Sequence, residues 1–386
     1  MKNYQLNFCL FYFIYYITFG AFSPYLNVYF DNLGLSGDQI GTINSLCMLA
    51  GMLAAPLFGM IADKTRKTKF VMGTLLVLSA LSLYVFSIQT KYYPILITFI
   101  LFGIFKNDIG NLQDSICSKY CNSDNVDFSK IRIFGSFGYL FGSFVLATVL
   151  SKLGIEGPYI KTLIFCYLFS VLILFILPSD IEESNKTKIN IIPAAKQLFK
   201  DKNFITITII YLFAMCLVDI VNNYIGMHFV NAFKLDSSKV AFYTFVMILP
   251  ELIILSNGGK IIDKLGWKRF YTIAALGQIL RYVVYSLTSN VIIFYIATFT
   301  HGLSVLMSAV CNIRFMSEKI NRDLLSTAIS TYGSVALITQ ALYNKIFGML
   351  IDKFGTYSIF YFSLILSLIL LIIVRSTKIF NDMKKE

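Results

Sequence analysis

The stretch Lys106–Tyr139 reads KNDIGNLQDSICSKYCNSDNVDFSKIRIFGSFGY, and it sets Lys106, Asp108, Asp114 and Arg132 within or beside two strongly apolar runs. Each run belongs to a segment long enough to cross a bilayer as a helix, which needs about 20 residues. A charge at bilayer depth costs about 2.5–3.5 kcal/mol on insertion scales, so it persists where it faces water or another charge. We therefore predict that this helix pair forms one wall of a polar cavity, around which the other membrane helices are arranged.

The composition indicates a membrane protein. Of the 386 residues, 57% are hydrophobic and only 14% are charged, whereas about a quarter of a soluble domain is charged. The net charge of +12 would suit a nucleic-acid partner, but basic residues of membrane proteins gather in cytoplasmic loops, so we predict no nucleic-acid binding. The seven Cys are scattered without a CxxC pair, which favours small buried hydrophobes over disulfides or a metal site. No metal or other cofactor is predicted.

Twelve apolar segments follow one another along the chain, and their lengths suit tilted helices rather than barrel strands. They predict an all-α integral membrane fold of twelve transmembrane helices in two six-helix bundles, over residues 1–180 and 204–386. The polar connection 181–203 is predicted to be a cytoplasmic linker with one amphipathic surface helix. The segments cover residues 6–30, 39–62, 70–89, 92–116, 131–151, 158–178, 204–231, 238–262, 269–288, 291–315, 324–350 and 356–375.

Lys and Arg are distributed unevenly between the loops of this topology. If both termini are cytoplasmic, 24 of the 33 basic residues fall on the cytoplasmic side and 7 on the outer side, with Lys106 and Arg281 left inside the membrane. Because cytoplasmic loops are enriched in basic residues, this asymmetry predicts a multi-pass protein of the plasma (inner) membrane with both termini in the cytoplasm.

An internal repeat supports the division into two halves. Residues 59–64 read GMIADK and residues 259–264 read GKIIDK, so a Gly and an Asp recur 200 residues apart, at the end of the second helix of each half. Two six-helix halves of similar topology are typical of transporters whose substrate site lies near the bilayer midplane between the halves. The repeat therefore indicates a secondary transporter.

The first of these motifs resembles one of the major facilitator superfamily. Residues 59–67 read GMIADKTRK, and the superfamily's loop between its second and third helices reads G-x-x-x-D-[RK]-x-G-[RK]-[RK]. This chain departs from the pattern at the second glycine, where Arg66 stands. The resemblance implies a pair of pseudo-symmetric bundles with a conformational gate at Gly59, Asp63, Arg66, Gly259 and Asp263.

The resemblance extends to the lactose-permease family of oligosaccharide:proton symporters and to the related phenylpropionate permeases. Residues 11–30, FYFIYYITFGAFSPYLNVYF, resemble the first helix of these proteins, and residues 56–64, PLFGMIADK, resemble the end of the second. A substrate-binding Glu and Arg of that family match Asp114 and Arg132, at the same separation of 18 residues. The resemblance implies four substrate-binding residues in the first half: Asn107, Asp114, Arg132 and Tyr139, the last in place of a sugar-stacking Trp.

The second half resembles the same family at its coupling residues. Arg281 and His301 match an Arg and a His of the ninth and tenth helices, and Glu251 resembles the acid of phenylpropionate permeases in the eighth. Lactose permeases carry the proton-shuttling carboxylate one turn after that His, where this chain has Ser304. The resemblance therefore implies proton coupling through Glu251, Arg281 and His301, with His301 also contacting the substrate.

Three further intramembrane charges have no assigned role. Lys106 and Asp108 have no charged counterpart in that family, and Asp219 resembles an intramembrane Asp of the seventh helix whose usual Lys partner is absent here. Since Lys106 and Asp108 are two residues apart and point away from each other on a helix, each needs its own partner. The predicted partner of Lys106 is Asp219, across the cavity between the halves.

Each cluster also has a purely structural interpretation. Asp114 and Arg132 either hold a polyol through several hydrogen bonds or form a structural ion pair. Glu251, Arg281 and His301 either carry a proton or only hold helices together. Proton uptake and release by Glu251 is chemically reasonable. Desolvation favours the neutral carboxyl group, whereas an approaching Arg favours the ionised one.

Two other features of the apolar segments have local interpretations. His228 lies near the outer end of its segment and is predicted to be interfacial. Gly135, Gly138 and Gly142 place small residues every three or four positions, which predicts close helix packing rather than phosphate binding.

Three functions remain open at this point. The first is a proton symporter that imports a small polar solute by alternating access, with a sugar or glycoside ahead of a nucleoside or aromatic acid. The second is a drug-type efflux antiporter of the same fold, and the third is a non-transporting membrane sensor. The absence of a Walker motif leaves ATP drive unsupported. We expect a monomer in the lipid bilayer and no enzymatic activity.

Overall fold

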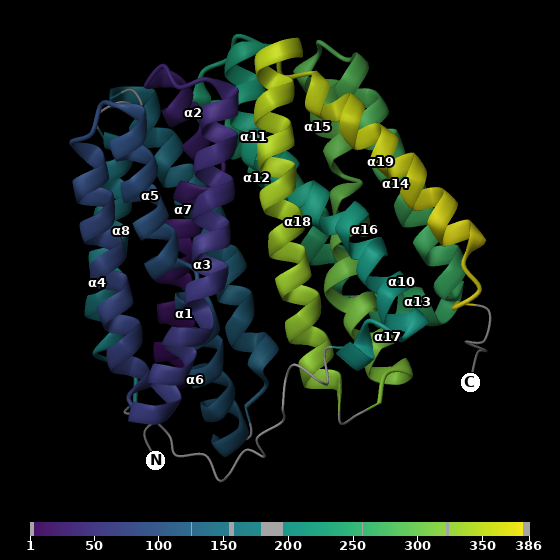
Figure 1. The fold of residues 1–386 in the computed structure, drawn as a ribbon, viewed down its shortest axis with the longest axis horizontal. Helices are drawn as coiled ribbons and strands as arrows, with labels where there is room; N and C mark the ends of the chain where they lie inside the picture. The colour runs from purple at the N-terminus through teal and green to yellow at the C-terminus, as the bar shows by residue number, and fades with distance from the viewer. Residues whose placement is uncertain are drawn as a thin grey trace. The chain divides into compact units, whose positions relative to one another are not determined.

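The computed structural model describes residues 4–124, 126–153, 158–178, 196–256, 258–321 and 324–380. All regular elements in these ranges are helices, as predicted, and each of the twelve predicted segments coincides with one helix or a run of helices (Figure 1). The described chain therefore has the all-α membrane architecture that the apolar pattern indicates.

The first six segments form a chain of helices with two interruptions. The first segment is broken at Ser23–Tyr25, where Pro24 cannot donate a helical hydrogen bond. The fourth is broken at Asn107 and Asp108, beside Lys106. These segments comprise α1 (Gln5–Phe22) with α2 (Leu26–Asn32), α3 (Gly37–Thr65), α4 (Thr68–Ser87), α5 (Tyr92–Lys106) with α6 (Ile109–Asp124), α7 (Phe128–Leu153) and α8 (Pro158–Leu174).

The last six segments contain more interruptions, including two short π-helical stretches. They comprise α10 (Lys202–Tyr211), η1 (Leu212–Cys216) and α11 (Leu217–Asn231); α12 (Val240–Ser256) with α13 (Gly258–Leu265); α14 (Trp267–Leu287); α15 (Val291–Thr298), α16 (His301–Val305), η3 (Leu306–Cys311) and α17 (Asn312–Lys319); α18 (Leu325–Phe354); and α19 (Ser358–Ser376). Single-turn π-bulges inside helices are frequently found at functional sites, and η3 directly follows the helix that carries His301.

Eight helical spans of the described chain are long and apolar enough to cross a bilayer, and two shorter apolar helices, Pro158–Leu174 and Val291–Val305, accompany them. Of the two remaining segments, one is divided between α12 and α13, and the other, α14, carries Lys268, Arg269 and Arg281. Their weaker apolar signal therefore follows from a helix break and from charges that have specific positions in the fold.

Several helices begin at residues whose side chains satisfy the free amide groups of a first turn. Ser36 and Gln39 form a reciprocal capping box at the start of α3, with the Ser36 hydroxyl accepting from the Gln39 amide and the Gln39 side chain accepting from the Ser36 amide. The carboxylate of Asp201 caps α10, and the side chain of Asn290 caps α15. These caps fix where the membrane helices start.

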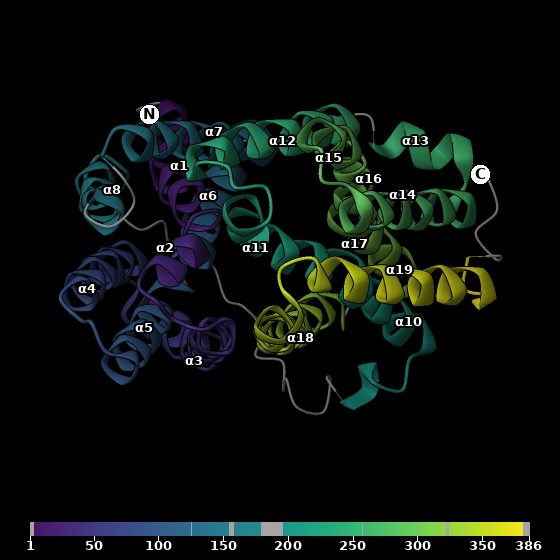
Figure 2. The same ribbon diagram turned by 90° about the horizontal axis from the view of Figure 1, so that it is seen from above.

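The helices divide into two compact units. The first contains the described residues up to 178 together with Leu235–Ala241, and the second contains the rest. Most of the predicted linker 181–203 lies outside the described residues. Within the first unit α1 packs against α7, and α4 packs against α5 and α8; within the second, α14 packs against α19 and α16 (Figure 2).

Glycines bring α1 and α7 into close contact in the first unit. A Cβ atom on Gly138 would collide with the carbonyl oxygen of Phe13, and one on Gly142 would collide with that of Ile17. From the other side, a Cβ on Gly20 would collide with the carbonyl oxygen of Tyr139. This is the close packing that small residues permit between membrane helices, and it fixes the position of α7, which carries Arg132.

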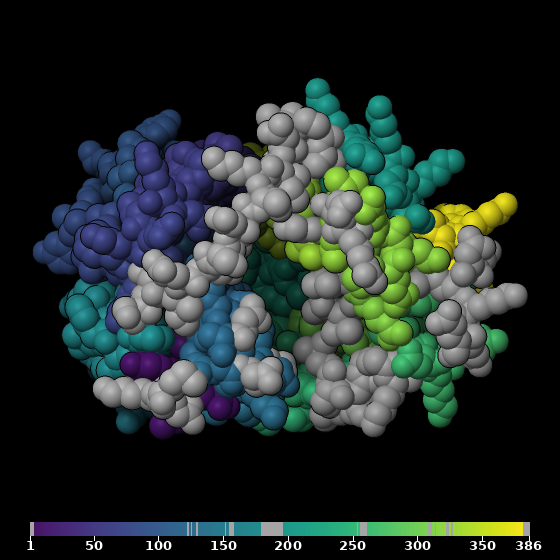
Figure 3. Space-filling model, turned by 90° about the horizontal axis from the view of Figure 1, so that it is seen from below, coloured from purple at the N-terminus to yellow at the C-terminus, as the bar shows by residue number. Residues whose placement is uncertain are grey.

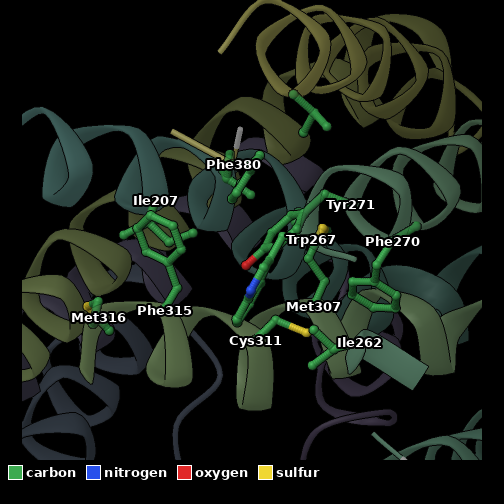
Figure 4. Packing of buried hydrophobic residues seen from close by; sticks show 14 of the residues in the cluster. Ile207, Ile262, Trp267, Phe270, Tyr271, Met307, Cys311, Phe315, Met316 and Phe380 are labelled. Carbon is green, nitrogen blue, oxygen red and sulfur yellow. The ribbon is translucent and has the colours of Figure 1, made fainter. Parts of the chain in front are cut away.

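The second unit has an aromatic core where α14 begins (Figure 4). Trp267, Tyr271 and Phe380 belong to it, and the rings of Tyr271 and Phe380 stack with centroids 4.6 Å apart. The Tyr271 hydroxyl donates to the Asn312 side chain at 2.6 Å, and Asn312 donates to the Tyr332 hydroxyl at 2.8 Å. These hydrogen bonds tie α14, α17 and α18 together and give the buried hydroxyls of Tyr271 and Tyr332 and the amide of Asn312 partners.

Candidate functional site

In the first unit, Tyr12 of α1 links the two predicted substrate-binding charges. Its hydroxyl donates a hydrogen bond of 2.5 Å to the Asp114 carboxylate, and its ring lies 5.8 Å from the Arg132 guanidinium. The guanidinium lies closer to the ring of Tyr16, at 4.4 Å, in a cation–π contact. Within the described chain no ion pair of 4.0 Å or less joins Asp114 to Arg132. The two charges share a tyrosine instead of neutralising each other directly.

The two other residues expected at this site lie in different surroundings. Tyr139 is half-buried on α7, seven residues after Arg132, where its backbone packs against Gly20. Asn107 follows the last residue of α5, and its amide packs so tightly on α3 that a Cβ on Gly51 would collide with it. Tyr139 is therefore on the helix of Arg132, whereas Asn107 contributes to the contact between α3 and α5.

Lys106 and Asp108 flank the break between α5 and α6 and have separate surroundings, as their spacing predicts. The Lys106 ammonium lies 4.4 Å from the ring centroid of Phe22 and within 6 Å of two further Phe rings. Asp108 is 4% exposed; one of its oxygens accepts from Asn111 at 3.1 Å, and the other has no hydrogen-bond partner in the described chain. The pairing of Lys106 with Asp219 would join the two units and stays a prediction.

In the second unit, the three residues expected to couple to protons lie together. Glu251 Oε2 lies 3.9 Å from Nε2 of His301, and Nδ1 of His301 lies 3.3 Å from Nη1 of Arg281. Arg281 and His301 are each 2% exposed, whereas the Glu251 side chain is 22% exposed. A carboxyl group that water can reach is thus connected through one imidazole to a buried guanidinium.

Close packing of α12 on α16 creates this arrangement. A Cβ on Gly302 would lie 2.9 Å from the backbone of Pro250, so only glycine permits the approach. Glu251 follows Pro250 and His301 precedes Gly302 in the sequence. The contact between the two backbones therefore sets the distance between the two side chains.

The contacts of Arg281 determine the tautomer of His301. A guanidinium has no acceptor atom, so Nδ1 of His301 must accept from Arg281. The proton of the neutral imidazole then resides on Nε2, the nitrogen that faces Glu251. Arg281 also donates to the Ser304 hydroxyl at 3.3 Å. In the sequence, Ser304 was noted only because it stands where lactose permeases carry a carboxylate. Its position one turn after His301 could have indicated that it contacts Arg281.

Asp219 has a partner that the sequence analysis missed. The side chain of Gln340, on α18, donates to the Asp219 carboxylate at 2.9 Å. Asn344 lies one turn further along α18 and is 1% exposed. The sequence signal for this contact was the pair of amide side chains at i and i+4 in a membrane segment. Buried amides in a membrane helix need polar partners, so the pair could have predicted a polar group on a neighbouring helix.

His228 lies in the last turn of α11, and its interfacial position stays a prediction. Its side chain is 0% exposed, and Nδ1 lies 2.9 Å from the Thr356 hydroxyl. Its ring stacks on that of Phe294 and meets the edges of Phe233, Tyr357 and Phe360. The aromatic neighbours come from α15, from the start of α19 and from the residues just after α11, so the histidine is enclosed by rings although it lies near the end of its helix.

The predicted gate residues have unequal contacts in the two units. Asp263 of α13 forms a 3.0 Å ion pair with Arg314 of α17, which also binds Glu318 at 2.9 Å. Asp63 is exposed near the end of α3, and no atom of the described residues outside that helix lies within 4 Å of a Cβ built on Gly59. Gly259 lies in α13. Figure 3 shows the end of the molecule at which α3 gives way to α4.

Arg66 explains how this chain departs from the superfamily motif. It ends α3 with φ of +55°, a left-handed conformation in which glycine is usually found. The second glycine of the motif falls at this residue. In this chain an arginine thus adopts a backbone conformation that glycine adopts more easily, at the position where the motif has glycine.

The cysteines do not form a metal site in the described chain. No group of three His, Cys, Asp or Glu side chains there could hold a metal ion. The sulfur atoms of Cys117 and Cys121 lie 4.0 Å apart, one turn apart on α6, and all seven cysteines are free.

A helical chain that crosses a membrane many times, with charged clusters inside its spans, has the features of a polytopic transporter. Comparisons with known proteins identify the group. The profile of the MFS_1-like family matches residues 5–362. The chain therefore belongs to this family of the major facilitator superfamily, and it is a membrane permease rather than an enzyme.

Individual relatives agree with this assignment. The uncharacterized transporter YwbF of Bacillus subtilis (strain 168) is 24% identical over 327 residues, covering 84% of this chain and 81% of the relative. The maltose permease of Geobacillus stearothermophilus is 24% identical over 341 residues, covering 85% and 82%. A crystal structure of the nucleoside transporter NupG matches with a TM-score of 0.81 at 18% identity, covering 99% of this chain and 100% of that chain. The fold of twelve transmembrane helices in two six-helix bundles is thereby confirmed.

Proposed function

We propose that the protein is a proton-coupled symporter that imports a small polar solute by alternating access. The observation that carries this proposal is the Glu251–His301–Arg281 cluster: a partly exposed carboxyl group, 3.9 Å from a buried imidazole that contacts a buried guanidinium. Intramembrane ionisable groups in such a cluster are functional candidates by default, because their insertion is costly.

Glu251 is the proton carrier in this proposal. The neutral tautomer of His301 already carries its proton on Nε2, so it faces Glu251 as a donor and cannot accept a second proton without becoming a cation beside Arg281. His301 therefore positions the ionised carboxylate, and Arg281 holds the imidazole in that tautomer. Protonation of Glu251 removes the charge that attracts His301 and frees the carboxyl group to move with α12.

The Asp114–Tyr12–Arg132 cluster is the proposed substrate site in the first unit. A carboxylate and a guanidinium held apart by a tyrosine offer an acceptor and a planar donor to the hydroxyl groups of a solute. Half-buried Tyr139, on the same helix as Arg132, offers a ring for stacking. The similarity to a maltose permease supports a sugar or glycoside as the first substrate to test, with nucleosides and aromatic acids next.

Uptake into proteoliposomes tests the proposal. Vesicles containing purified protein are given labelled sugars, nucleosides and aromatic acids, with and without an inside-alkaline pH gradient. We expect one class to accumulate above its external concentration only with the gradient, and a protonophore to abolish the accumulation. Accumulation that is unaffected by the protonophore would refute proton coupling.

The proposed membrane orientation follows from the basic residues. With both termini in the cytoplasm, 24 of the 33 Lys and Arg lie on the cytoplasmic side of the plasma membrane. A reporter domain fused after residue 386 is expected to be active only in its cytoplasmic form. Activity of a periplasmic or extracellular reporter at that position would reverse the orientation.

A further inference from the structure

An apolar groove of about 590 Å³ runs between α4 and α8 on the first unit. Its lining includes Phe70, Val77, Val171 and Leu174. Gly73 opens the groove, because even a Cβ atom there would lie 3.2 Å from the Leu174 side chain. Phe70 is 72% exposed, so the groove is a lateral surface of the unit and not part of the Tyr12–Asp114–Arg132 cluster.

Two lysines line the end of this groove at which α4 begins. Lys67 is exposed at the position before α4. Lys69 donates to the carbonyl oxygens of Phe175 at 3.2 Å and Leu177 at 2.7 Å, just beyond the end of α8. The carbonyl groups at a helix end carry partial negative charge, so Lys69 ties α4 to α8. The groove thus combines an apolar floor with positive charge at one end.

The second unit carries the same combination. A groove of about 450 Å³ lies between α14 and α19, and it is lined by Leu265, Lys268, Arg269, Thr272, Ile273 and Arg375. Arg269 stands 200 residues after Lys69, the offset of the repeated GMIADK motif. In each unit the helix after the repeated motif packs against the last helix of that unit. The two grooves therefore occupy equivalent positions in the repeat.

We propose that each groove binds one anionic phospholipid, with an acyl chain along the apolar floor and the phosphate headgroup against the basic residues. Charge complementarity selects this occupant. A zwitterionic lipid would bring no net negative charge to Lys67, Arg269 and Arg375, and a soluble anion would leave the floor without an apolar partner. Each basic residue near an anionic lipid surface contributes about 1 kcal/mol to binding. The apolar floor with basic residues at one end recurs in both units, so it does not depend on one local sequence. The proposal is independent of the transported solute.

The lipid is expected to stabilise each unit. Its chain and headgroup would contact both helices of the groove, so removal would expose the apolar floor and leave the basic residues to repel one another. Anything that binds only the folded state raises its stability by mass action.

Native mass spectrometry and thermal unfolding of the full-length protein in detergent test the proposal, with dioleoylphosphatidylglycerol as the probe. Dioleoylphosphatidylcholine carries the same chains, and inorganic phosphate carries the same anion without chains. We expect two phosphatidylglycerol molecules to be retained and to raise the unfolding temperature, and neither comparison compound to do so. Equal retention of phosphatidylcholine, or equal stabilisation by phosphate, would overturn the proposal.

Variants assign the two sites separately. Lys67→Gln should weaken one site about 5-fold, and Arg269→Gln with Arg375→Gln should weaken the other about 30-fold, at about 1 kcal/mol per charge. Gly73→Val, which keeps every charge but fills the floor, should also remove one lipid. Lys91→Gln and Lys353→Gln, in neither groove, serve as controls and should retain two. Retention of both lipids by the groove variants would contradict the assignment, as would equal loss in the controls.

Discussion

At the scale of single residues, the guanidinium of Arg132 has a task that another cation cannot perform. Its central carbon lies 4.4 Å from the ring centroid of Tyr16 and 5.8 Å from that of Tyr12, within the range of cation–π contacts. A lysine keeps the charge but loses the planar fork and the stacking. We expect Arg132→Lys to weaken substrate binding at least tenfold, measured by titration calorimetry, while the unfolding temperature changes little. Unchanged affinity would move the substrate site away from Arg132.

Replacement of Arg66 by glycine is expected to raise the stability of the protein. Because it adopts φ of +55° at the end of α3, Arg66→Gly should remove a conformational cost of about 1 kcal/mol. Thermal unfolding of the purified variant should show a higher midpoint. Lys64→Gly, in the last turn of the same helix, is the matched control and should lower the midpoint, because glycine in a helix costs about 1 kcal/mol. A lower midpoint for Arg66→Gly would contradict the account of the turn.

At the scale of helices, the contact between α1 and α7 holds the first-unit cluster together. Gly138→Ala places a Cβ against the carbonyl oxygen of Phe13, so the helices must separate and carry Tyr12 away from Arg132. We expect a loss of about 1–3 kcal/mol in stability, the range for overpacking, together with weaker substrate binding. Gly110→Ala, where no atom of the described chain outside its own helix lies within 4 Å, should lower neither, and alanine in place of a helical glycine should if anything raise stability. Equal effects of the two alanine substitutions would show that the contact between α1 and α7 does not determine stability or substrate binding.

The same scale shows what sequence could predict. Segment positions followed from apolar length, because each helix must cross the same thickness of hydrocarbon. The closeness of Arg281 to His301 was implied by the resemblance to the lactose-permease family, in which an Arg and a His stand at the same separation. The Tyr12–Asp114 bond joins residues 102 positions apart, and no local pattern specifies such a partner. The break after Lys106 and the burial of His228 were missed for the same reason: both depend on which helices pack around them.

At the scale of the whole molecule, transport requires an equilibrium between conformations, and the exposed Asp263–Arg314 pair is placed to influence it. The pair links α13 to α17 at 3.0 Å, and exposed pairs contribute about 0.2–1 kcal/mol. Asp263→Asn should therefore change the rate of substrate exchange in proteoliposomes by up to about fivefold, with little effect on equilibrium binding. Loss of binding in a folded variant would place Asp263 in the substrate site instead.

The central claim is that Glu251 carries the coupling proton, and one comparison in proteoliposomes tests it most directly. Glu251→Gln keeps the size and the hydrogen-bonding capacity of the side chain but cannot release a proton. Accumulation driven by a pH gradient should vanish, whereas exchange of labelled for unlabelled substrate should continue, because exchange needs no net proton release. Asp352→Asn, at an exposed carboxylate near the end of α18, is the control and should keep both activities. A Glu251→Gln protein that still accumulates substrate with the pH gradient would contradict the account.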